Sequence, residues 1–353
     1  MEGYDYKLPK ELVAQAPAEP RDAARLFVYD TRADRVTLDI FANLAKYLPV
    51  DSVLVLNDTK VVPARLELEK RLGGKVRILF LFNEWNGGAT IQGLPDRMIR
   101  VGDALRLVGP KPDERLLVEV LSHKNEEYTF KILVPVEEFR KTCAEQGRTP
   151  LPPYIHSDLN ETELRERYQT EFAEKPASVA APTASLHFTK GVFKALTEKG
   201  IERAHVTLHV GRGTFSPVTD AMKSVGLLHG EPIEVSAKAA RLIREAKQSG
   251  RTVIAAGTTA TRLLEAAASH ILAGDIPDDG YRDETQLFIQ PPYDFKIVDV
   301  LITNFHLPGT SLLVLLDAFL RDKGAKQSWH KLYRHAIAEK FRFYSFGDAM
   351  LII

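Results

Sequence analysis

Three apolar runs in the chain each end abruptly in polar or flexible residues. The runs and the residues that end them are VDVLITNFHLPGTSLL (298–313) with Thr303, Asn304 and His306, AHVTLHVGRGTF (204–215) with His209, Gly211 and Gly213, and TVIAAGTTATRLLE (252–265) with Gly257, Thr258 and Thr259. Such runs are typical of buried parallel strands, whose carboxyl ends meet at one edge of a sheet and form a ligand crevice there. The pattern therefore predicts one pocket at three strand ends.

Helical periodicity lies between and after these runs. Ser236 is expected to cap a helix that ends at Gly250, and further helices are expected to begin near Thr258 and Thr310. Helices that alternate with apolar strands indicate a layered α/β architecture. The polar segment GDIPDDGYRDE (274–284) is expected to be an irregular, mobile loop.

The pattern changes after Pro63. Six segments then alternate or run apolar between glycine-containing turns: LELEK, KVRILFLF, ATIQGL, ALRLV, LLVEVLS and YTFKILV. This pattern indicates a small antiparallel barrel or sandwich, and the proline-rich stretch TPLPPYI (149–155) forbids both helix and central strand. We therefore predict an α/β fold in which residues 1–62 and 151–353 form the layered α/β main domain. An antiparallel β-barrel domain is inserted at 63–150.

The composition limits the kinds of partner that the protein can bind. The 353 residues exceed the usual size of one domain, and 47 basic residues balance 47 acidic ones, so RNA can be bound only by a local patch. The best local candidate is the basic region 321–342. The alternative is a solvated amphipathic helix whose inner face comprises Trp329, Leu332, Tyr333, Ala336 and Ile337.

Cysteine and histidine usage argues against a metal centre. Cys143 is the only cysteine, which excludes an internal disulfide framework and clustered thiolate ligands. His330 and His335 would lie about 140° apart around a helix, so they form no ligand pair. The charged N-terminus lacks the apolar core of a signal peptide, and no run of about 18 apolar residues exists. We expect a cytoplasmic protein with no metal and no membrane contact.

Histidines are the first candidates for proton transfer, because they titrate near physiological pH. They are His187, His209, His229 and His306. A single histidine among apolar neighbours is more often structural. His209 and His306 gain weight because both are expected to face the same crevice. His187 gains weight from the close-packed loop SVAAPTASLHF (178–188).

Carboxylates and helix starts offer further polar chemistry. Asp58, Glu231 and Glu265 are candidate carboxylates, although Arg262 and Glu265 also have the spacing of a surface ion pair. The helix start at Gly257–Thr259 predicts a carboxylate or phosphate site, with an ordinary N-cap as the alternative. No G-x-G-x-x-G, Walker or G-x-S-x-G motif follows any predicted strand, which argues against a dinucleotide fold, a Walker nucleotide site and a serine hydrolase.

Seven segments in register along the chain resemble the motifs of a known family. They are NDTKVVPARL (57–66), PLPPYI (150–155), EKPASVAAPTASLHF (174–188), LHVGRGTFSPV (208–218), AGTTATRLLE (256–265), TNFHLPGTSLL (303–313) and FGDAMLI (346–352). Together they resemble the S-adenosylmethionine:tRNA ribosyltransferase-isomerases of the queuosine pathway. The resemblance implies an α/β domain with an inserted β-barrel, S-adenosylmethionine as co-substrate, and tRNA as partner.

The reaction implied by this resemblance is transfer and isomerisation of the ribosyl part of S-adenosylmethionine. The acceptor is the aminomethyl group of a 7-deazaguanine at the tRNA wobble position, and the products are epoxyqueuosine-tRNA, adenine and methionine. On this basis we expect His187 and His306 to carry protons, with Asn304 and His209 orienting ribose or base. Glu231 is expected to hold the aminomethyl cation.

The remaining residues are expected to contact substrate. The methionine carboxylate is assigned to Gly257, Thr258, Thr259 and Arg262. The other expected contacts are Asp58, Arg65, Thr183, Gly211, Gly213, Thr214 and Glu265.

Departures from the family pattern keep other functions open. They are Arg77, Ser185, Arg212 and Gly230, and Ser185 and Arg212 could reshape the pocket. One alternative is an S-adenosylmethionine-dependent lyase or transferase acting on another acceptor, and a second is a non-catalytic RNA-binding protein. We expect a monomer.

Overall fold

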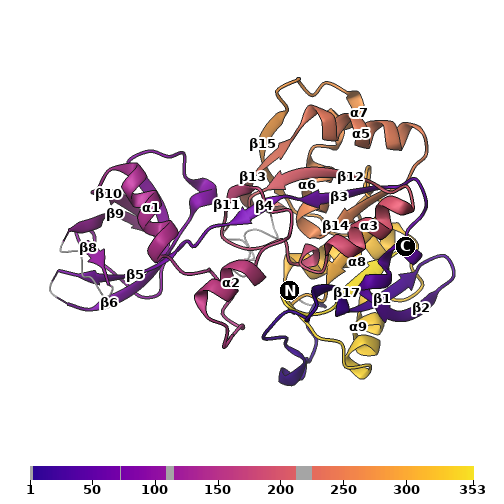
Figure 1. Cartoon of the computed structure of the whole chain (residues 1–353), viewed down its shortest axis with the longest axis horizontal. Coiled ribbons are helices and arrows are strands. Elements are labelled where there is room, and N and C mark those ends of the chain that lie inside the picture. The colour runs from indigo at the N-terminus through magenta and orange to yellow at the C-terminus, as the bar shows by residue number, and fades with distance from the viewer. Residues whose placement is uncertain (1–2, 72, 109–114, 212–224) are drawn as a thin grey trace.

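The computed structural model describes residues 3–71, 73–108, 115–211 and 225–353. The chain forms a layered α/β part and a closed β-barrel that extends to one side of it (Figure 1). The α/β fold class with an inserted antiparallel barrel is therefore confirmed.

The α/β part is built on one large mixed sheet. Within the described residues its strand order is β15-β13-β12-β3-β14-β16-β17-β1-β2. The strands are β1 (Arg25–Asp30), β2 (Arg35–Ile40), β3 (Val53–Asn57), β12 (Glu202–Leu208), β13 (Leu227–Val235), β14 (Val253–Ala256), β15 (Tyr281–Leu287), β16 (Val300–Asn304) and β17 (Ala349–Ile352). The central strands β12, β3, β14 and β16 are parallel, so their carboxyl ends meet at one edge.

Helices cover both faces of this sheet, which explains the unbroken apolar runs of its central strands. Val53 and Val55 of β3 pack into one core cluster, and Leu54 and Leu56 pack into another on the opposite face. The first face is covered by α5 (Ala237–Gln248), α6 (Thr258–Ala266), α7 (Ala268–Ala273), α8 (Ser311–Asp322) and α9 (Trp329–Ala338). The second face is covered by α3 (Lys190–Glu198) and the 3-10 turn η3 (Phe41–Lys46).

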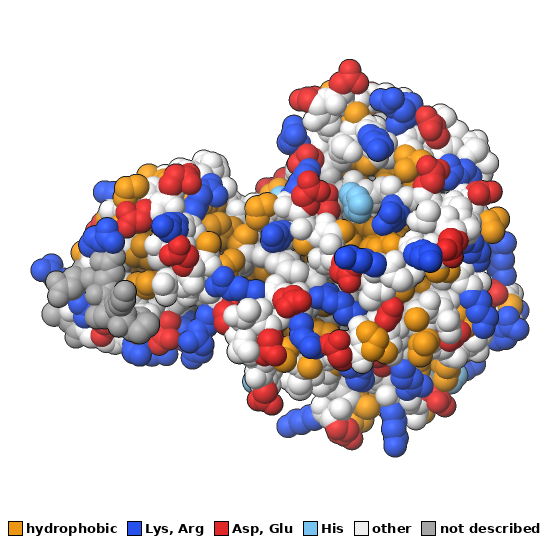
Figure 2. Space-filling model, viewed as in Figure 1, with side chains coloured by type: hydrophobic (Ala, Val, Ile, Leu, Met, Phe, Trp, Pro, Cys, Tyr) orange, Lys and Arg blue, Asp and Glu red, His pale blue; other side chains and the backbone are white. Residues whose placement is uncertain are grey.

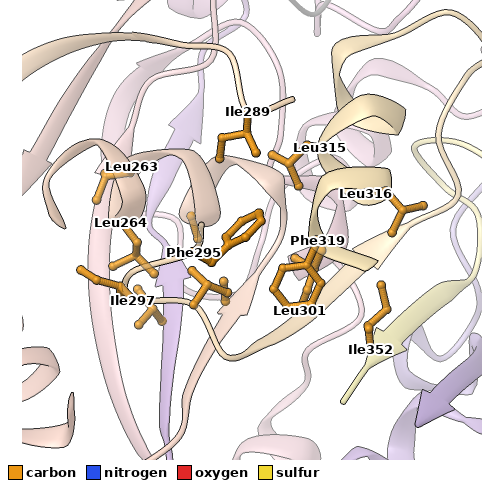
Figure 3. Packing of buried hydrophobic residues seen from close by; sticks show 14 of the residues in the cluster. Leu263, Leu264, Ile289, Phe295, Ile297, Leu301, Leu315, Leu316, Phe319 and Ile352 are labelled. Atoms are coloured by element: carbon orange, nitrogen blue, oxygen red, sulfur yellow. The ribbon is translucent and has the colours of Figure 1, made fainter. Parts of the chain in front are cut away.

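The helix starts agree with the sequence prediction. The Ser236 side chain accepts a hydrogen bond from the backbone N–H of Ala239 at 3.2 Å, and α6 and α8 begin at Thr258 and Ser311. Figure 3 shows how α8 is held, with Phe319 beside Leu301 of β16 and Leu315 near Ile289. This packing holds α8 against β16.

The barrel has its own core. Its closed order is β10-β7-β6-β5-β8-β9. The strands are β5 (Arg65–Lys70), β6 (Lys75–Phe80), β7 (Thr90–Pro95), β8 (Ala104–Leu107), β9 (Leu116–Lys124) and β10 (Glu127–Ile132), and α1 (Val136–Gln146) packs against them through Phe139. All six predicted strands are confirmed, whereas the domain limits at 63 and 150 stay a prediction.

Short elements connect the two parts of the chain (Figure 1). Strands β4 (Thr59–Val61) and β11 (Lys175–Ser178) pair in parallel, and α2 (Glu161–Arg167) follows the proline-rich stretch. The remaining short elements are the 3-10 turns η1 (Lys10–Leu12), η2 (Arg21–Ala23), η4 (Phe82–Glu84) and η5 (Thr183–Ser185). Residues 149–155 form neither helix nor strand, as predicted.

The prediction of an irregular loop at 274–284 is partly wrong. Its last residues belong to β15, which pairs antiparallel with β13 at the edge of the sheet. Arg282, Asp283 and Glu284 are exposed on this edge strand, so the segment lacks the apolar alternation by which strands are recognised.

The described helices are short. The longest, α5 and α8, have 12 residues each, so no helix in the described ranges is long and apolar enough to cross a bilayer.

Candidate functional site

A cavity of about 360 Å³ lies at the carboxyl edge of the parallel strands. Gly257, Thr258 and Thr259 line it from the end of β14, and Thr303 and Asn304 line it from the end of β16. The predicted convergence of these two strand ends on one cavity is therefore confirmed. The other lining residues that carry polar or aromatic groups are Tyr154, Tyr168, Thr183, His229, Glu231, Arg262, Phe305, His306, Thr310, Ser311, Tyr344 and Ser345.

The start of α6 faces this cavity without a side-chain cap. Gly257 has φ +94, a conformation that side chains rarely adopt, and no side chain caps the helix in the described part of the chain. The hydroxyl of Thr259 is buried and has no hydrogen-bond partner among the described residues. Uncapped N–H groups at a helix start favour an anion, so the start of α6 suits a carboxylate.

A buried ion pair lies in the same cavity. Arg262 is 8% exposed and donates a hydrogen bond from Nη1 to Oε2 of Glu231, which is 4% exposed. Oε1 of Glu231 accepts the backbone N–H of Gly211 at 3.1 Å, and Nε of Arg262 donates to the carbonyl of Leu287 at 3.1 Å. Nη2 of Arg262 is buried with no partner among the described residues.

His306 is a buried imidazole on the wall of the cavity. Its Nε2 lies 2.8 Å from the hydroxyl of Thr303, and its backbone N–H donates to the Tyr333 hydroxyl at 2.8 Å. Burial lowers the pKa of His306 to about 3, because the charged imidazolium loses its hydration there. The ring is therefore neutral at physiological pH.

Asn304 joins two segments at the cavity. Its Oδ1 accepts a hydrogen bond from the Thr183 hydroxyl at 3.1 Å, and its Nδ2 donates to the carbonyl of Asp348 at 3.5 Å. The Asp348 carboxylate is held in turn by Arg342 at 2.9 Å. A fixed amide of this kind is suited to orienting a sugar hydroxyl or a base edge.

Comparison with known proteins decides the family. Residues 1–352 match the family model described as queuosine biosynthesis protein. The chain belongs to this family. An S-adenosylmethionine:tRNA ribosyltransferase-isomerase from Thermus thermophilus is 43% identical over 358 residues, which cover 100% of this chain and 99% of that protein. A protein of the same name from Carboxydothermus hydrogenoformans is 40% identical with the same coverage.

A solved structure supports the same assignment. The crystal structure of an S-adenosylmethionine tRNA ribosyltransferase from Thermotoga maritima is 31% identical to this chain, with a TM-score of 0.53 and coverage of 99% of both chains. The family resemblance of the seven sequence motifs is thereby confirmed over the whole chain.

The prediction that His209 faces this cavity is wrong. Side chains alternate along β12 and its extension, so Leu208 and Val210 point to one face and His209 points to the other. Val210 lines the cavity, whereas Nδ1 of His209 lies 2.8 Å from the Thr59 hydroxyl. Burial lowers the pKa of His209 in this position.

His187 lies behind the cavity wall in this family member. It follows η5, whose Thr183 and Ala184 line the cavity, but its own ring packs against Phe41 at 5.1 Å. Burial lowers its pKa to about 4, and its Nε2 has no hydrogen-bond partner in the described ranges.

Two further predicted contact residues, Asp58 and Arg65, are absent from the cavity lining. Asp58 accepts the Thr207 hydroxyl at 2.7 Å, and burial raises its pKa. Arg65 donates to the carbonyl of Leu151 at 3.3 Å, and burial lowers its pKa.

Glu265 points away from the cavity to the loop before β16. It accepts the backbone N–H groups of Lys296, Ile297 and Val298 at 2.9, 3.0 and 3.0 Å, while burial raises its pKa. The alternative of a surface Arg262–Glu265 pair is wrong, because both side chains are buried and Arg262 pairs with Glu231.

Gly211 contacts Glu231 through its backbone, but it does not line the cavity. A Cβ at Gly211 would lie 2.4 Å from Nδ2 of the Asn83 side chain in the barrel, so this buried amide occupies the space that a larger residue would need. Arg212, Gly213 and Thr214 lie outside the described residues.

Sequence reasoning missed an aromatic wall of the cavity. The rings of Tyr154 and Tyr344 lie 5.0 Å apart, and the Tyr154 hydroxyl is 2.7 Å from that of Ser345. Tyr344 has φ +71, which is rare for a non-glycine residue and marks a constrained position. Two of the family motifs could have indicated this wall. PLPPYI (150–155) contains Tyr154, and FGDAMLI (346–352) begins two residues after Tyr344.

The basic region 321–342 contains the predicted amphipathic helix. Trp329, Leu332, Tyr333 and Ala336 of α9 are buried. Several of its basic residues are neutralised, since Arg321 pairs with Asp317 at 3.0 Å and Arg342 with Asp348 at 2.9 Å. On the face drawn in Figure 2, acidic and basic side chains are interspersed. An RNA contact by this region stays a prediction.

Metal ligands are not clustered in the described part of the chain. No group of three or more His, Cys, Asp or Glu side chains there could hold a metal ion, and Cys143 is buried in the barrel core.

Proposed function

We propose that the protein transfers the ribosyl part of S-adenosylmethionine, with isomerisation, to the aminomethyl group of a 7-deazaguanine at the tRNA wobble position. The products are epoxyqueuosine-tRNA, adenine and methionine. The observation that carries this proposal is a single cavity that combines unpaired donors, a buried carboxylate and a neutral imidazole. Family membership supplies the reaction, and the cavity supplies groups for each of its requirements.

The start of α6 is the proposed site of the methionine carboxylate. The uncapped helix start, the Thr259 hydroxyl and Nη2 of Arg262 are donors without a partner among the described residues. Their convergence on one cavity matches a carboxylate, which accepts several hydrogen bonds at once.

The ribose and adenine are proposed to lie between Asn304 and the aromatic wall. Asn304 is held by Thr183 and by the carbonyl of Asp348, so its amide is fixed before substrate binds. Tyr154 and Tyr344 offer ring surfaces to a planar base. Glu231 is proposed to receive the aminomethyl cation.

His306 is the proposed proton carrier at the reacting atoms. A primary amine has a reference pKa of about 10, and the sulfonium makes the neighbouring ribose C5′ hydrogens acidic, so the site needs a proton acceptor. A neutral imidazole at the cavity wall can accept a proton and then donate it to departing adenine. His187 does not line the cavity, so we propose that it acts by positioning η5.

A product assay tests this function. The protein is incubated with S-adenosylmethionine and tRNA carrying the aminomethyl-deazaguanine, and the expected result is free adenine together with the matching mass gain on the modified nucleoside. Asn304→Ala and His306→Ala should lower the rate at least tenfold, while His330→Ala, at an exposed histidine outside the cavity lining, should leave it unchanged.

The same assay separates the alternatives. If adenine release continues after nuclease digestion of the tRNA, the acceptor is a small molecule and the proposed function is wrong. If the protein binds the tRNA without releasing adenine, it is a non-catalytic RNA-binding protein. A splayed wobble base is compatible with the cavity, because a base in an anticodon loop is extruded at lower cost than one in a duplex.

A further inference from the structure

Two opposite charges are buried side by side in the cavity, and each has binding capacity left over. Arg262 and Glu231 both line the cavity, and their side chains are only 9% and 6% exposed. A buried ion pair is costly to desolvate unless further hydrogen bonds satisfy both partners. The mutual contact alone therefore does not explain why both charges are buried.

Arg262 has a donor that no described residue uses. Nε binds the Leu287 carbonyl and Nη1 binds Glu231, which leaves Nη2 buried without a partner among the described residues. Thr259 lies three residues earlier on the same face of α6, and its hydroxyl is likewise buried and unpaired there. Two independent unpaired donors on one helix face indicate a site for an anion.

Glu231 has acceptor positions that no hydrogen bond among the described residues uses. A carboxylate offers about four lone-pair positions, and the hydrogen bonds from Gly211 and Arg262 use one on each oxygen. The remaining positions suit a cationic donor that enters the cavity. Glu231 therefore offers a site for a cation next to the anion site at Arg262.

We propose that Arg262 and Glu231 form a charge bridge between the two substrates. The amino-acid carboxylate of the sulfonium donor binds Arg262 and Thr259, and the aminomethyl cation of the acceptor base binds Glu231. The charges then alternate as carboxylate, guanidinium, carboxylate and ammonium. This inference rests on the proposed function and concerns binding alone.

With this bridge, binding of either substrate should increase the affinity of the protein for the other. Each added charge strengthens the polarisation of the buried pair in a medium of low dielectric, and coupling between two bound ligands is reciprocal. We expect the donor to bind about tenfold more tightly when the acceptor carries its aminomethyl group, within the usual range of such coupling.

Calorimetry with an unreactive donor tests the bridge. S-adenosylhomocysteine, which keeps the amino-acid end, is titrated into the full-length protein with tRNA that bears either aminomethyl-deazaguanine or guanine at the wobble position. The wild type should show about tenfold tighter binding with the aminomethyl base. Glu231→Gln should reduce this ratio to about one. Equal ratios in the wild type and Glu231→Gln would overturn the proposal.

Glu234→Gln is the matched control. Glu234 lies on the same strand β13 and pairs with Lys175 at 2.6 Å, but it does not line the cavity. The coupling ratio should be unchanged in this variant. If Glu234→Gln also abolished the coupling, the loss would reflect a disturbance of β13 rather than removal of the Glu231 charge, and the proposal would be overturned.

A ligand without the carboxylate tests the proposal on the unaltered protein, so that a misfolded variant cannot decide the result. Decarboxylated S-adenosylhomocysteine should bind more weakly and show no coupling. Undiminished coupling with this ligand would place another anion, such as a tRNA phosphate, on Arg262 and overturn the assignment. If adenine is released in the product assay but coupling is absent, only the bridge fails; if no adenine is released, the proposed function fails.

Discussion

The hydroxyl of Thr303 lies 2.8 Å from Nε2 of His306, so the last residues of β16 hold an imidazole against the cavity. The apolar run of β16 places Thr303 inside the sheet edge, and the chain turns back within three residues to bring His306 beside it. Because a hydroxyl can donate or accept, this contact satisfies Nε2 in either tautomer.

The low pKa of His306 predicts a pH-dependent stability. Its folded pKa of about 3 lies below the unfolded value of 6.5, so the unfolded state binds the extra proton first. The stabilisation is fully present above pH 6.5 and is lost as the pH falls toward 3. Between pH 7.5 and 5 the loss from one such histidine is on the order of 2 kcal/mol.

Urea unfolding of His306→Gln at these two pH values measures this loss. The variant should lose less stability than the wild type on acidification, because it lacks the group that titrates. His330→Gln, at an exposed position, should behave like the wild type. The same pH dependence in all three proteins would show that His306 is already accessible to protons in the folded state.

Gly257 is expected to be required for donor binding because of its backbone conformation. Its φ of +94 strains any L side chain by about 1–3 kcal/mol, whereas a Cβ there would meet Ala184 only at an ordinary 3.5 Å. Gly257→Ala should therefore shift the start of α6 and raise the KM for S-adenosylmethionine roughly tenfold.

Gly250→Ala is the control for Gly257→Ala. Gly250 has φ +71 and open space around it, so alanine there also strains the backbone, but away from the cavity. Both variants should lower the melting temperature, but Gly250→Ala should leave the KM for S-adenosylmethionine unchanged. Equal KM values in the two variants would remove the start of α6 from the binding site.

Glu265 is expected to support the fold rather than contact substrate. Its carboxylate accepts three backbone N–H groups from residues 296–298. Glu265→Gln replaces one oxygen by an NH₂ group that cannot accept them, so the free energy of unfolding should fall by about 1–3 kcal/mol. Denaturant titration checks this loss, and steady-state kinetics below the melting range should show an unchanged KM for S-adenosylmethionine. An altered KM with unchanged stability would instead show that Glu265 contacts the substrate.

The sequence predicts most of the fold because the spacing of apolar residues reflects which side chains of a helix or strand are buried. Strands β3 and β14 appear as unbroken apolar runs since helices cover both faces, and the barrel strands appear as alternating segments. Gly257 and Asn304 could be placed at one cavity because the ends of parallel strands share an edge of the sheet.

The rest of the site depends on contacts that local patterns do not encode. The face on which His209 lies is set by alternation in an extension of β12, where a shift of one residue would have exchanged it with Val210. Arg262 has Glu265 at a favourable spacing, yet its partner is Glu231, 31 positions away across the sheet edge. Tyr154 reaches the cavity only through tertiary packing.

Gly211 and Asn83 are expected to be energetically coupled across the contact between barrel and sheet. Gly211 does not have a positive φ, so alanine is compatible with its backbone. The obstacle is Nδ2 of Asn83, 2.4 Å from the position of the new Cβ, while the backbone N–H of Gly211 holds Glu231 at 3.1 Å. Gly211→Ala should therefore displace η4 of the barrel or loosen Glu231, and it should lower both stability and activity.

A double-mutant cycle tests this coupling. Asn83 is buried and its amide has no hydrogen-bond partner among the described residues, so Asn83→Ala removes the obstacle at little cost. The double variant should recover much of the stability lost in Gly211→Ala, with an interaction energy of about 0.5–3 kcal/mol. Gly191→Ala, where the nearest atom lies at 3.6 Å, is the tolerated control. Additive losses in the cycle would mean that the segment at Gly211 moves independently of the barrel, because a shared steric contact requires a non-additive result.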